Sequence, residues 1–169
     1  MATGVTSVSE QEYLGTTYKP ACDYIDGVLR QKSMPTFSHS AIQGQLIVLI
    51  NPRFPQYWAG PELTVKIRTG KYLVPDVAVQ RRDRIQDPYP EAPIHLCIEI
   101  LSPEDRISEV LAKCEEYHEW GVETAWVIDP ESRRAWVFNR GKRPVEIPVT
   151  GSLTAEGISV SMPELFAAL

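Results

Sequence analysis

Apolar residues recur at helical spacing in two parts of the chain, and each recurrence predicts a helix with one buried face. The first covers about residues 38–51, with Ser38 as the expected N-cap and Pro52 as the expected stop. The second follows Ser102-Pro103 and runs to about Trp120, where Gly121 ends it. The two inward stripes consist of Ile42, Leu46, Leu49 and Ile50, and of Ile107, Val110, Leu111, Cys114 and Tyr117.

Short apolar runs between turn residues predict strands. Asp26-Gly27 is typical of a hairpin turn, and Thr69-Gly70 separates a second pair of runs. Ser9 with Glu12 forms a capping-box pattern that predicts a short helix over residues 10–14, and SMPELFAAL at the end predicts another. The expected strands lie in CDYIDGVLRQKS, LTVKIR, KYLVPDVAVQ, HLCIEIL, TAWVID and RRAWVFN.

The predicted order is helix, three strands, helix and two strands, preceded by an N-terminal hairpin. This order indicates an α/β layered fold with a mixed sheet. We expect a single domain over residues 1–169, with a helix and hairpin extension (1–37), a core (38–140) and a C-terminal tail (141–169).

Composition narrows the function classes. With 43% hydrophobic and 23% charged residues, the chain has the composition of an ordinary globular protein. No apolar run approaches the roughly 18 residues of a membrane helix, and no secretory signal is recognised, so no membrane partner is expected. Three scattered cysteines argue against a disulfide framework or zinc site and favour a cytoplasmic protein. A net charge of −5 argues against non-specific nucleic-acid binding by the whole surface.

Two acidic residues lie in apolar strands. Glu99 interrupts the run from Leu96 to Leu101, where an unpaired charge costs several kcal/mol. Asp76 lies in LVPDVAV, directly after Pro75, which cannot donate a ladder hydrogen bond and so indicates a bulge or an edge. If both side chains point to the same side of the sheet, the two carboxylates converge.

Two explanations of these acids remain open from the residues alone. Converging carboxylates can share a hard cation such as Mg²⁺ or Mn²⁺ together with a substrate phosphate. Alternatively, arginine side chains or backbone N–H groups pair with each acid separately. Lys113 has the same ambiguity, because its amine could lie over the end of the Glu99 strand or pair with Glu109 at the surface.

The ordered set of PD, IEILSPEDR, KxxxY and GVxxxWVIDP, with YIDG and His39 before it, resembles the Uma-two endonuclease family. That family belongs to the PD-(D/E)XK restriction-endonuclease-like superfamily, and the resemblance covers roughly residues 9–138. It implies a restriction-endonuclease-like core in which Asp76, Glu99 and Ile100 bind the metal and Lys113 is catalytic. Leu101 stands where the superfamily pattern has lysine, and Lys113 on the following helix replaces it.

The resemblance also adds four candidate site residues: Asp23, His39, Glu109 and Tyr117. Asp23 stands where relatives often have glutamate and could be a further ligand or only a cap. His39 could line the cleft or form a local hydrogen bond. Tyr117 is expected in the core with its hydroxyl near the site, and Trp126 in the core.

These observations lead to a hypothesis of a Mg²⁺- or Mn²⁺-dependent endonuclease that hydrolyses phosphodiester bonds in nucleic acid, with DNA as the expected substrate. The alternative is a catalytically inactive member of the same fold that binds nucleic acid or protein. A carboxylate-pair glycosidase ranks last, since Tyr57 and Trp58 are its only support. Restriction-like folds often act as homodimers, but no sequence feature identifies an interface.

Overall fold

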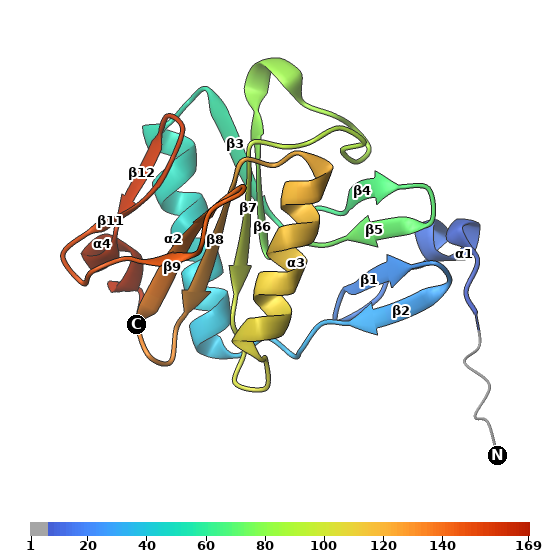
Figure 1. Cartoon of the computed structure of the whole chain (residues 1–169), viewed down its shortest axis with the longest axis horizontal. Helices are drawn as coiled ribbons and strands as arrows, with labels where there is room; N and C mark the ends of the chain where they lie inside the picture. Colours follow the sequence, from blue (N-terminus) through green and yellow to red (C-terminus); the bar gives the residue numbers. More distant parts are fainter. Residues whose placement is uncertain (1–6) are drawn as a thin grey trace.

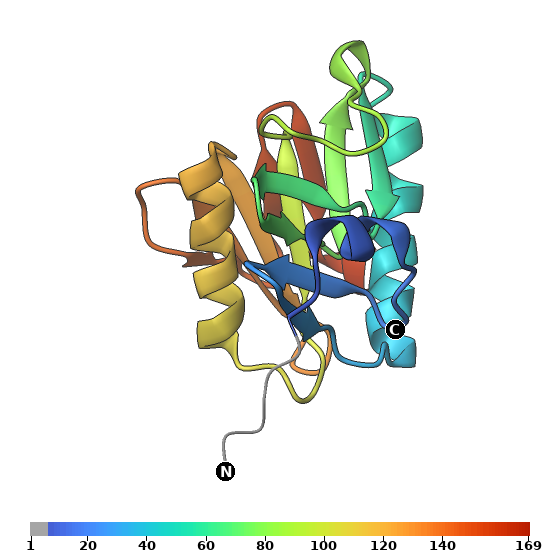
Figure 2. The same ribbon diagram turned by 90° about the vertical axis from the view of Figure 1, so that its right-hand side faces the viewer.

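The computed structural model describes residues 7–169 and places a six-stranded mixed sheet between two long helices (Figures 1 and 2). Helix α2 covers one face and helix α3 the other. Strands β7 and β8 are parallel, and the other neighbours in this sheet are antiparallel. The order is β10-β9-β8-β7-β6-β3, with bounds Val145–Glu146, Arg134–Asn139, Thr124–Asp129, Leu96–Ile100, Val77–Arg81 and Tyr57–Pro61; α2 is Phe37–Arg53 and α3 is Ile107–Trp120.

Alternation along the central strands sorts their side chains between the two faces. Leu96, Ile98 and Ile100 of β7 pack into the cluster that α2 covers, together with the fully buried Trp126. Cys97 points to the opposite face and packs against Tyr117 of α3. Both faces of β7 are therefore covered, which explains its almost uninterrupted apolar sequence.

A second sheet of four strands lies beside α3, on the same side of the first sheet (Figures 1 and 2). Its order is β2-β1-β5-β4, with bounds Val28–Gln31, Cys22–Ile25, Lys71–Leu73 and Val65–Arg68. Helix α1 (Glu10–Gly15) packs on it through Tyr13, which stacks on Tyr24. Asp26 and Gly27 both have positive φ, as the tight turn between β1 and β2 requires.

The C-terminal segment completes the core on the α2 side. Strands β11 (Ser152–Ala155) and β12 (Ile158–Ser161) form a hairpin, and α4 (Met162–Phe166) follows it. Leu153 and Leu165 are fully buried against the α2 cluster. A short 3₁₀ helix, η1 (Arg82–Arg84), follows β6.

The α/β fold with a mixed sheet and an N-terminal hairpin is as the sequence predicted. So are both short helices, since Ser9 caps α1 by accepting from the Glu12 amide. Several boundaries were wrong. Thr36, not Ser38, caps α2, because its hydroxyl accepts from the His39 amide. Pro52 lies within the last turn of α2 and does not stop it.

The strand pattern also needed correction. The expected strand KYLVPDVAVQ is divided at Val74–Asp76, because β5 belongs to the four-stranded sheet and β6 to the six-stranded one. Strands β3 and β10 to β12 were not predicted. Helix α3 begins at Ile107, which is 40% exposed and lies outside the inward stripe.

Helices long and apolar enough to cross a bilayer are absent from residues 7–169. Cys22, Cys97 and Cys114 are all free and buried. Burial raises the pKa of the Cys97 and Cys114 thiols, which keeps them protonated and unreactive.

Candidate active site

The register between β6 and β7 places the two anomalous acids opposite each other. Ala78 pairs with Cys97 and Val77 with Ile98, so the next position would pair Asp76 with Glu99. Asp76 shares the face of Ala78, and Glu99 shares the face of Cys97, by strand alternation. The structure thus settles the orientation that the sequence left open: both carboxylates project to the α3 side, just beyond the end of the ladder.

Asp76 lies where the chain passes from one sheet to the other. It is 2% exposed, and Gln43 of α2 holds its main-chain carbonyl at 2.8 Å. Its Oδ2 accepts from the Ile100 amide at 2.7 Å, and its Oδ1 lies 2.5 Å from Lys32 Nζ and 3.2 Å from His39 Nε2. Burial alone would raise the pKa of Asp76, but Lys32 and His39 outweigh it and hold that pKa well below its usual range.

Glu99 is equally enclosed but less well compensated. Tyr117 donates its hydroxyl to Glu99 Oε1 at 2.6 Å, and Lys113 Nζ lies 3.2 Å from the same oxygen. Burial raises the pKa of Glu99 to about 7; the Lys113 ammonium opposes the shift, and the Asp76 charge adds to it. Near neutral pH this carboxyl is thus poised between its two protonation states.

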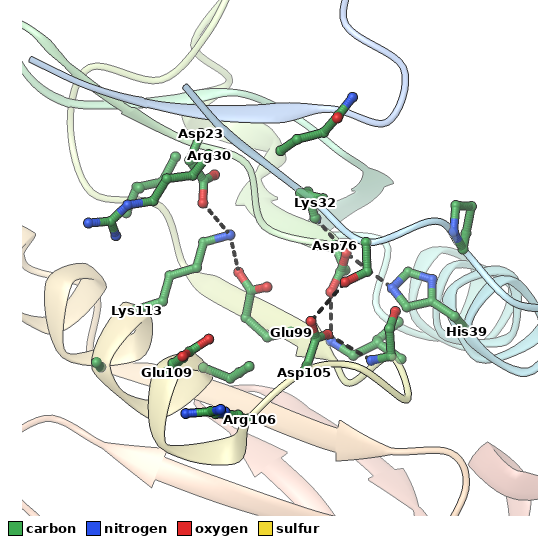
Figure 3. Close-up of a pocket in the computed structure, with 18 of the residues that line it drawn as sticks. Asp23, Arg30, Lys32, His39, Asp76, Glu99, Asp105, Arg106, Glu109 and Lys113 are labelled. Carbon is green, nitrogen blue, oxygen red and sulfur yellow. Dashed lines mark hydrogen bonds and ion pairs between the residues drawn. The ribbon is translucent and has the colours of Figure 1, made fainter. Parts of the chain in front are cut away.

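Lys113 reaches inward from α3 to the ends of the strands (Figure 3). Its Nζ lies 3.1 Å from Asp23 Oδ2, 3.2 Å from Glu99 Oε1 and 3.1 Å from the Val74 carbonyl that accepts from it. Burial lowers the pKa of Lys113, but Glu99 and Asp23 outweigh it and raise that pKa above the ordinary value. The inward placement, and not the surface pair with Glu109, is the one that the structure shows.

Asp23 comes from β1 and serves two partners. Its Oδ1 accepts from the Val74 amide at 2.7 Å, while its Oδ2 faces Lys113. Both oxygens are thereby engaged, so Asp23 fixes the position of the lysine and of the segment that leads to Asp76.

Lys32 was missed by the sequence reasoning. It follows β2 directly, and its Nζ contacts Asp76 Oδ1 and donates to the Val74 carbonyl at 3.0 Å. One signal could have found it: the hairpin register pairs Asp23 with Arg30, so a residue two positions beyond Arg30 shares the face of Asp23.

These residues line one cavity of about 310 Å³, a size typical of ligand sites (Figure 3). His39, Ile100 and Glu109 line it as well, whereas Tyr117 is fully buried behind Glu99. Arg30 and Arg106 lie at its exposed rim. Seven carboxylates and four Lys or Arg side chains line the cavity, so it attracts cations before anions.

The donor set fits a hard divalent ion held by few protein ligands. No cluster of three or more His, Cys, Asp or Glu side chains suited to a metal occurs in the described part of the chain. Mg²⁺ commonly binds through one or two carboxylates and completes its shell with water and substrate phosphate. Asp76 and Glu99 supply two carboxylates, and burial and the Asp76 charge, which raise the pKa of Glu99, are both effects that a bound cation would offset. The ligands would be Asp76, Glu99 and the Ile100 carbonyl.

Comparison with known proteins agrees with this fold. A crystal structure from Anabaena variabilis, described as "a putative nuclease belonging to DUF820", has 25% sequence identity and a TM-score of 0.80. The match covers 95% of this chain and 98% of that one. The DrdV–DNA complex matches at 16% identity and a TM-score of 0.44, over 66% of this chain and 10% of that chain.

No curated protein matches the chain significantly. A family model does: residues 11–167 match the model described as "Putative restriction endonuclease", which covers both the four-stranded sheet and the central sheet. Because the match spans almost the whole sequence, the chain belongs to the Uma-two (Uma2) family, and its fold is restriction-endonuclease-like.

Proposed function

We propose that this protein is a metal-dependent nuclease that hydrolyses phosphodiester bonds in nucleic acid, with DNA as its substrate. The observation that carries the proposal is the opposition of Asp76 and Glu99 in one cavity, with the Lys113 ammonium 3.2 Å from Glu99. Family membership and the Anabaena neighbour, described as a putative nuclease, point the same way.

In this proposal Asp76, Glu99 and the Ile100 carbonyl would hold Mg²⁺ or Mn²⁺. Such an ion would lower the pKa of a bound water and neutralise charge on the phosphate. Its positive charge would keep Glu99 ionised, since it offsets the burial and the Asp76 charge that raise the pKa of Glu99.

Lys113 then orients the attacking water or stabilises the charge that develops on the phosphoryl oxygens. Asp23 keeps the ammonium in place through its own ion pair, and Tyr117 fixes the Glu99 carboxylate. Arg30 and Arg106 at the rim are placed to contact neighbouring phosphates of the strand, which an acidic protein otherwise repels.

Cleavage assays test the proposal. Supercoiled plasmid, single- and double-stranded oligonucleotides and RNA would be incubated with protein and Mg²⁺ or Mn²⁺. We expect Asp76→Asn, Glu99→Gln and Lys113→Met each to lower the rate by about 10²–10³-fold. Asp83→Asn is the matched control, because Asp83 is exposed and, among residues 7–169, forms an ion pair only with Arg81. Cleavage that survives in EDTA, or that Asp76→Asn leaves intact, contradicts the proposal.

One observation favours a second candidate, a nuclease fold that binds nucleic acid without cleaving it. Each acid already has its own lysine, Lys32 at Asp76 and Lys113 at Glu99, so the charges are compensated without a metal. Calorimetry with Mn²⁺ separates the two functions. A metal-dependent nuclease should take up Mn²⁺, and Glu99→Gln should abolish that uptake. A binding module should show no Mn²⁺ uptake that depends on Glu99.

A further inference from the structure

Lys32 has no role in the mechanism above, yet its ammonium contacts two oxygen atoms of the kinds that bind metal ions. Its Nζ lies 2.5 Å from Asp76 Oδ1 and 3.0 Å from the Val74 carbonyl oxygen. A carboxylate oxygen and a main-chain carbonyl are the ligand types that a hard metal ion takes. The Lys32 side chain is 14% exposed and that of Asp76 is 3% exposed, so the pair is largely withdrawn from water.

The hydrogen bonds at Asp76 leave little room for a further partner. Its Oδ1 faces both Lys32 and His39, and its Oδ2 accepts from the Ile100 amide. Since each carboxylate oxygen has two lone-pair sites, Oδ1 is saturated. A cation that binds through Oδ1 therefore requires Lys32 or His39 to leave. Of the two, the Lys32 ammonium carries a full charge, so it repels a cation at either oxygen of Asp76.

We propose that Lys32 is an internal counter-ion of Asp76 that leaves it when a divalent cation binds. This inference rests on the metal site of the proposed function. It assigns to the residue directly after the N-terminal hairpin a role in controlling cation binding that the motif itself does not contain.

The two lysines of the cavity differ in what they retain. Lys113 pairs with both Asp23 and Glu99, so it still has the Asp23 carboxylate as a partner when Glu99 binds a metal ion. Lys32 pairs with Asp76 alone among the described residues and keeps only the Val74 carbonyl. Lys32 is therefore the lysine that metal binding sets free.

The movement requires only the side chain. The Lys32 amide donates to the Ala21 carbonyl at 2.9 Å, and the Ser33 hydroxyl donates to Asp105 Oδ1 at 3.0 Å. The first bond fixes the main chain at Lys32, and the second ties the next residue to the loop between β7 and α3. Four methylene groups give the ammonium enough reach to swing into the cavity that it already lines.

Amine labelling of the unmodified protein tests the release directly. The full chain would be treated with an acetylating reagent, with and without saturating Mn²⁺ and without nucleic acid, and the labelling rate of each lysine measured by mass spectrometry. We expect the rate at Lys32 to rise several-fold with Mn²⁺ while Lys113 stays slow. Lys142, which is exposed, is the internal reference and should not change.

Calorimetry provides the second measurement. Lys32→Met should bind Mn²⁺ about tenfold more tightly than the unmodified protein, because the competing charge is gone. Lys32→Arg keeps the charge and should bind no more tightly than the unmodified protein. Lys66→Met is the matched control, since Lys66 lies in the same four-stranded sheet and pairs with the exposed Glu91.

The outcomes distinguish this inference from the proposed function. If Mn²⁺ binds in a Glu99-dependent manner but labelling of Lys32 is unchanged or falls, or Lys32→Met binds no more tightly, the counter-ion role is wrong and the nuclease proposal stands. If neither the unmodified protein nor Lys32→Met takes up Mn²⁺ at Glu99, both are overturned.

Discussion

Asp76 and Glu99 face each other across two strands, yet their surroundings hold them in opposite electrostatic states. Asp76 has two cationic or donor side chains and a backbone amide, and its pKa is lowered. Glu99 has one hydroxyl and one shared lysine, and its pKa is raised to about 7. Asp76 is 2% exposed and Glu99 is 5% exposed, so a difference in burial does not explain why their pKa values shift in opposite directions.

The difference follows from which elements surround each acid. Asp76 lies at the junction of the two sheets, where Lys32 of the hairpin and His39 of α2 both reach it. Glu99 lies within the central sheet under α3, among apolar neighbours such as Cys97. Asp76 therefore stays ionised down to low pH, whereas the charge of Glu99 changes near neutral pH.

Removing Asp76 should have the largest effect on stability. Asp76→Ala leaves the buried Lys32 ammonium without its carboxylate, which costs about 3–5 kcal/mol. At about 2–4 °C per kcal/mol for a chain of this size, the midpoint temperature of thermal unfolding should fall by about 10 °C in EDTA. Thermal unfolding followed by circular dichroism measures it, with Asp83→Ala as the exposed control. An unchanged midpoint would show that the Lys32 pair contributes nothing.

Lys113→Met should have a smaller effect, although Lys113 has more partners than Lys32. Glu99 can take up a proton when the ammonium is lost, which relieves part of the cost and leaves about 2 kcal/mol, or about 6 °C. The double variant Lys113→Met/Glu99→Gln should recover part of this loss. If the double variant is no more stable than the single one, the charge of Glu99 is not the source of the cost.

The stability of the metal-free protein should depend on pH through Glu99. Its folded-state pKa of about 7 exceeds its ordinary value of 4.5, so the folded protein holds a proton that the unfolded chain has released. Stability should thus decrease as pH rises from 5 to 8, by about 5 °C in the midpoint. The contribution of Asp76 to stability has the opposite pH dependence. Because its folded-state pKa is lowered, this contribution is present above about pH 4 and is lost as pH falls further.

Glu99→Gln tests that assignment, because it should remove the decrease between pH 5 and pH 8. The groups that face Glu99 are Lys113, Asp76, Lys32 and Tyr117. All four remain in the variant, so a decrease that persists would have to come from another group and would contradict the raised pKa.

Tyr117→Phe should have the smallest effect. It removes one hydrogen bond to Glu99, worth about 1 kcal/mol, or about 2–4 °C. The loss should be larger at pH 8 than at pH 5, because an ionised carboxylate is the stronger acceptor. Equal losses at the two pH values would indicate that the hydroxyl stabilises Glu99 equally in both of its states.

The sequence carried much of the site because local patterns determine it. Strand alternation around Asp76 and Glu99, and the position of Lys113 on the following helix, were enough to predict that the three could converge. The inward stripe of α2 was likewise correct, since Ile42, Leu46, Leu49 and Ile50 are all buried.

What the sequence did not reveal depends on contacts between distant segments. Lys32 meets Asp76 across 44 residues, and no periodicity encodes how the hairpin docks. The division of β5 from β6 was missed because a period of two does not say which sheet a strand joins. Strand β3 contains Gly60 and Pro61, residues that weaken any strand pattern.

A single β-hairpin carries one partner for each half of the cavity: Asp23 holds Lys113, and Lys32, directly after its second strand, holds Asp76. Residues within the first 35 positions therefore determine part of the charge balance around Asp76 and Glu99, although they lie outside the strands next to these acids. Substitutions in this segment should therefore change the charge around Asp76 and Lys113 while leaving the strands of the central sheet unaltered.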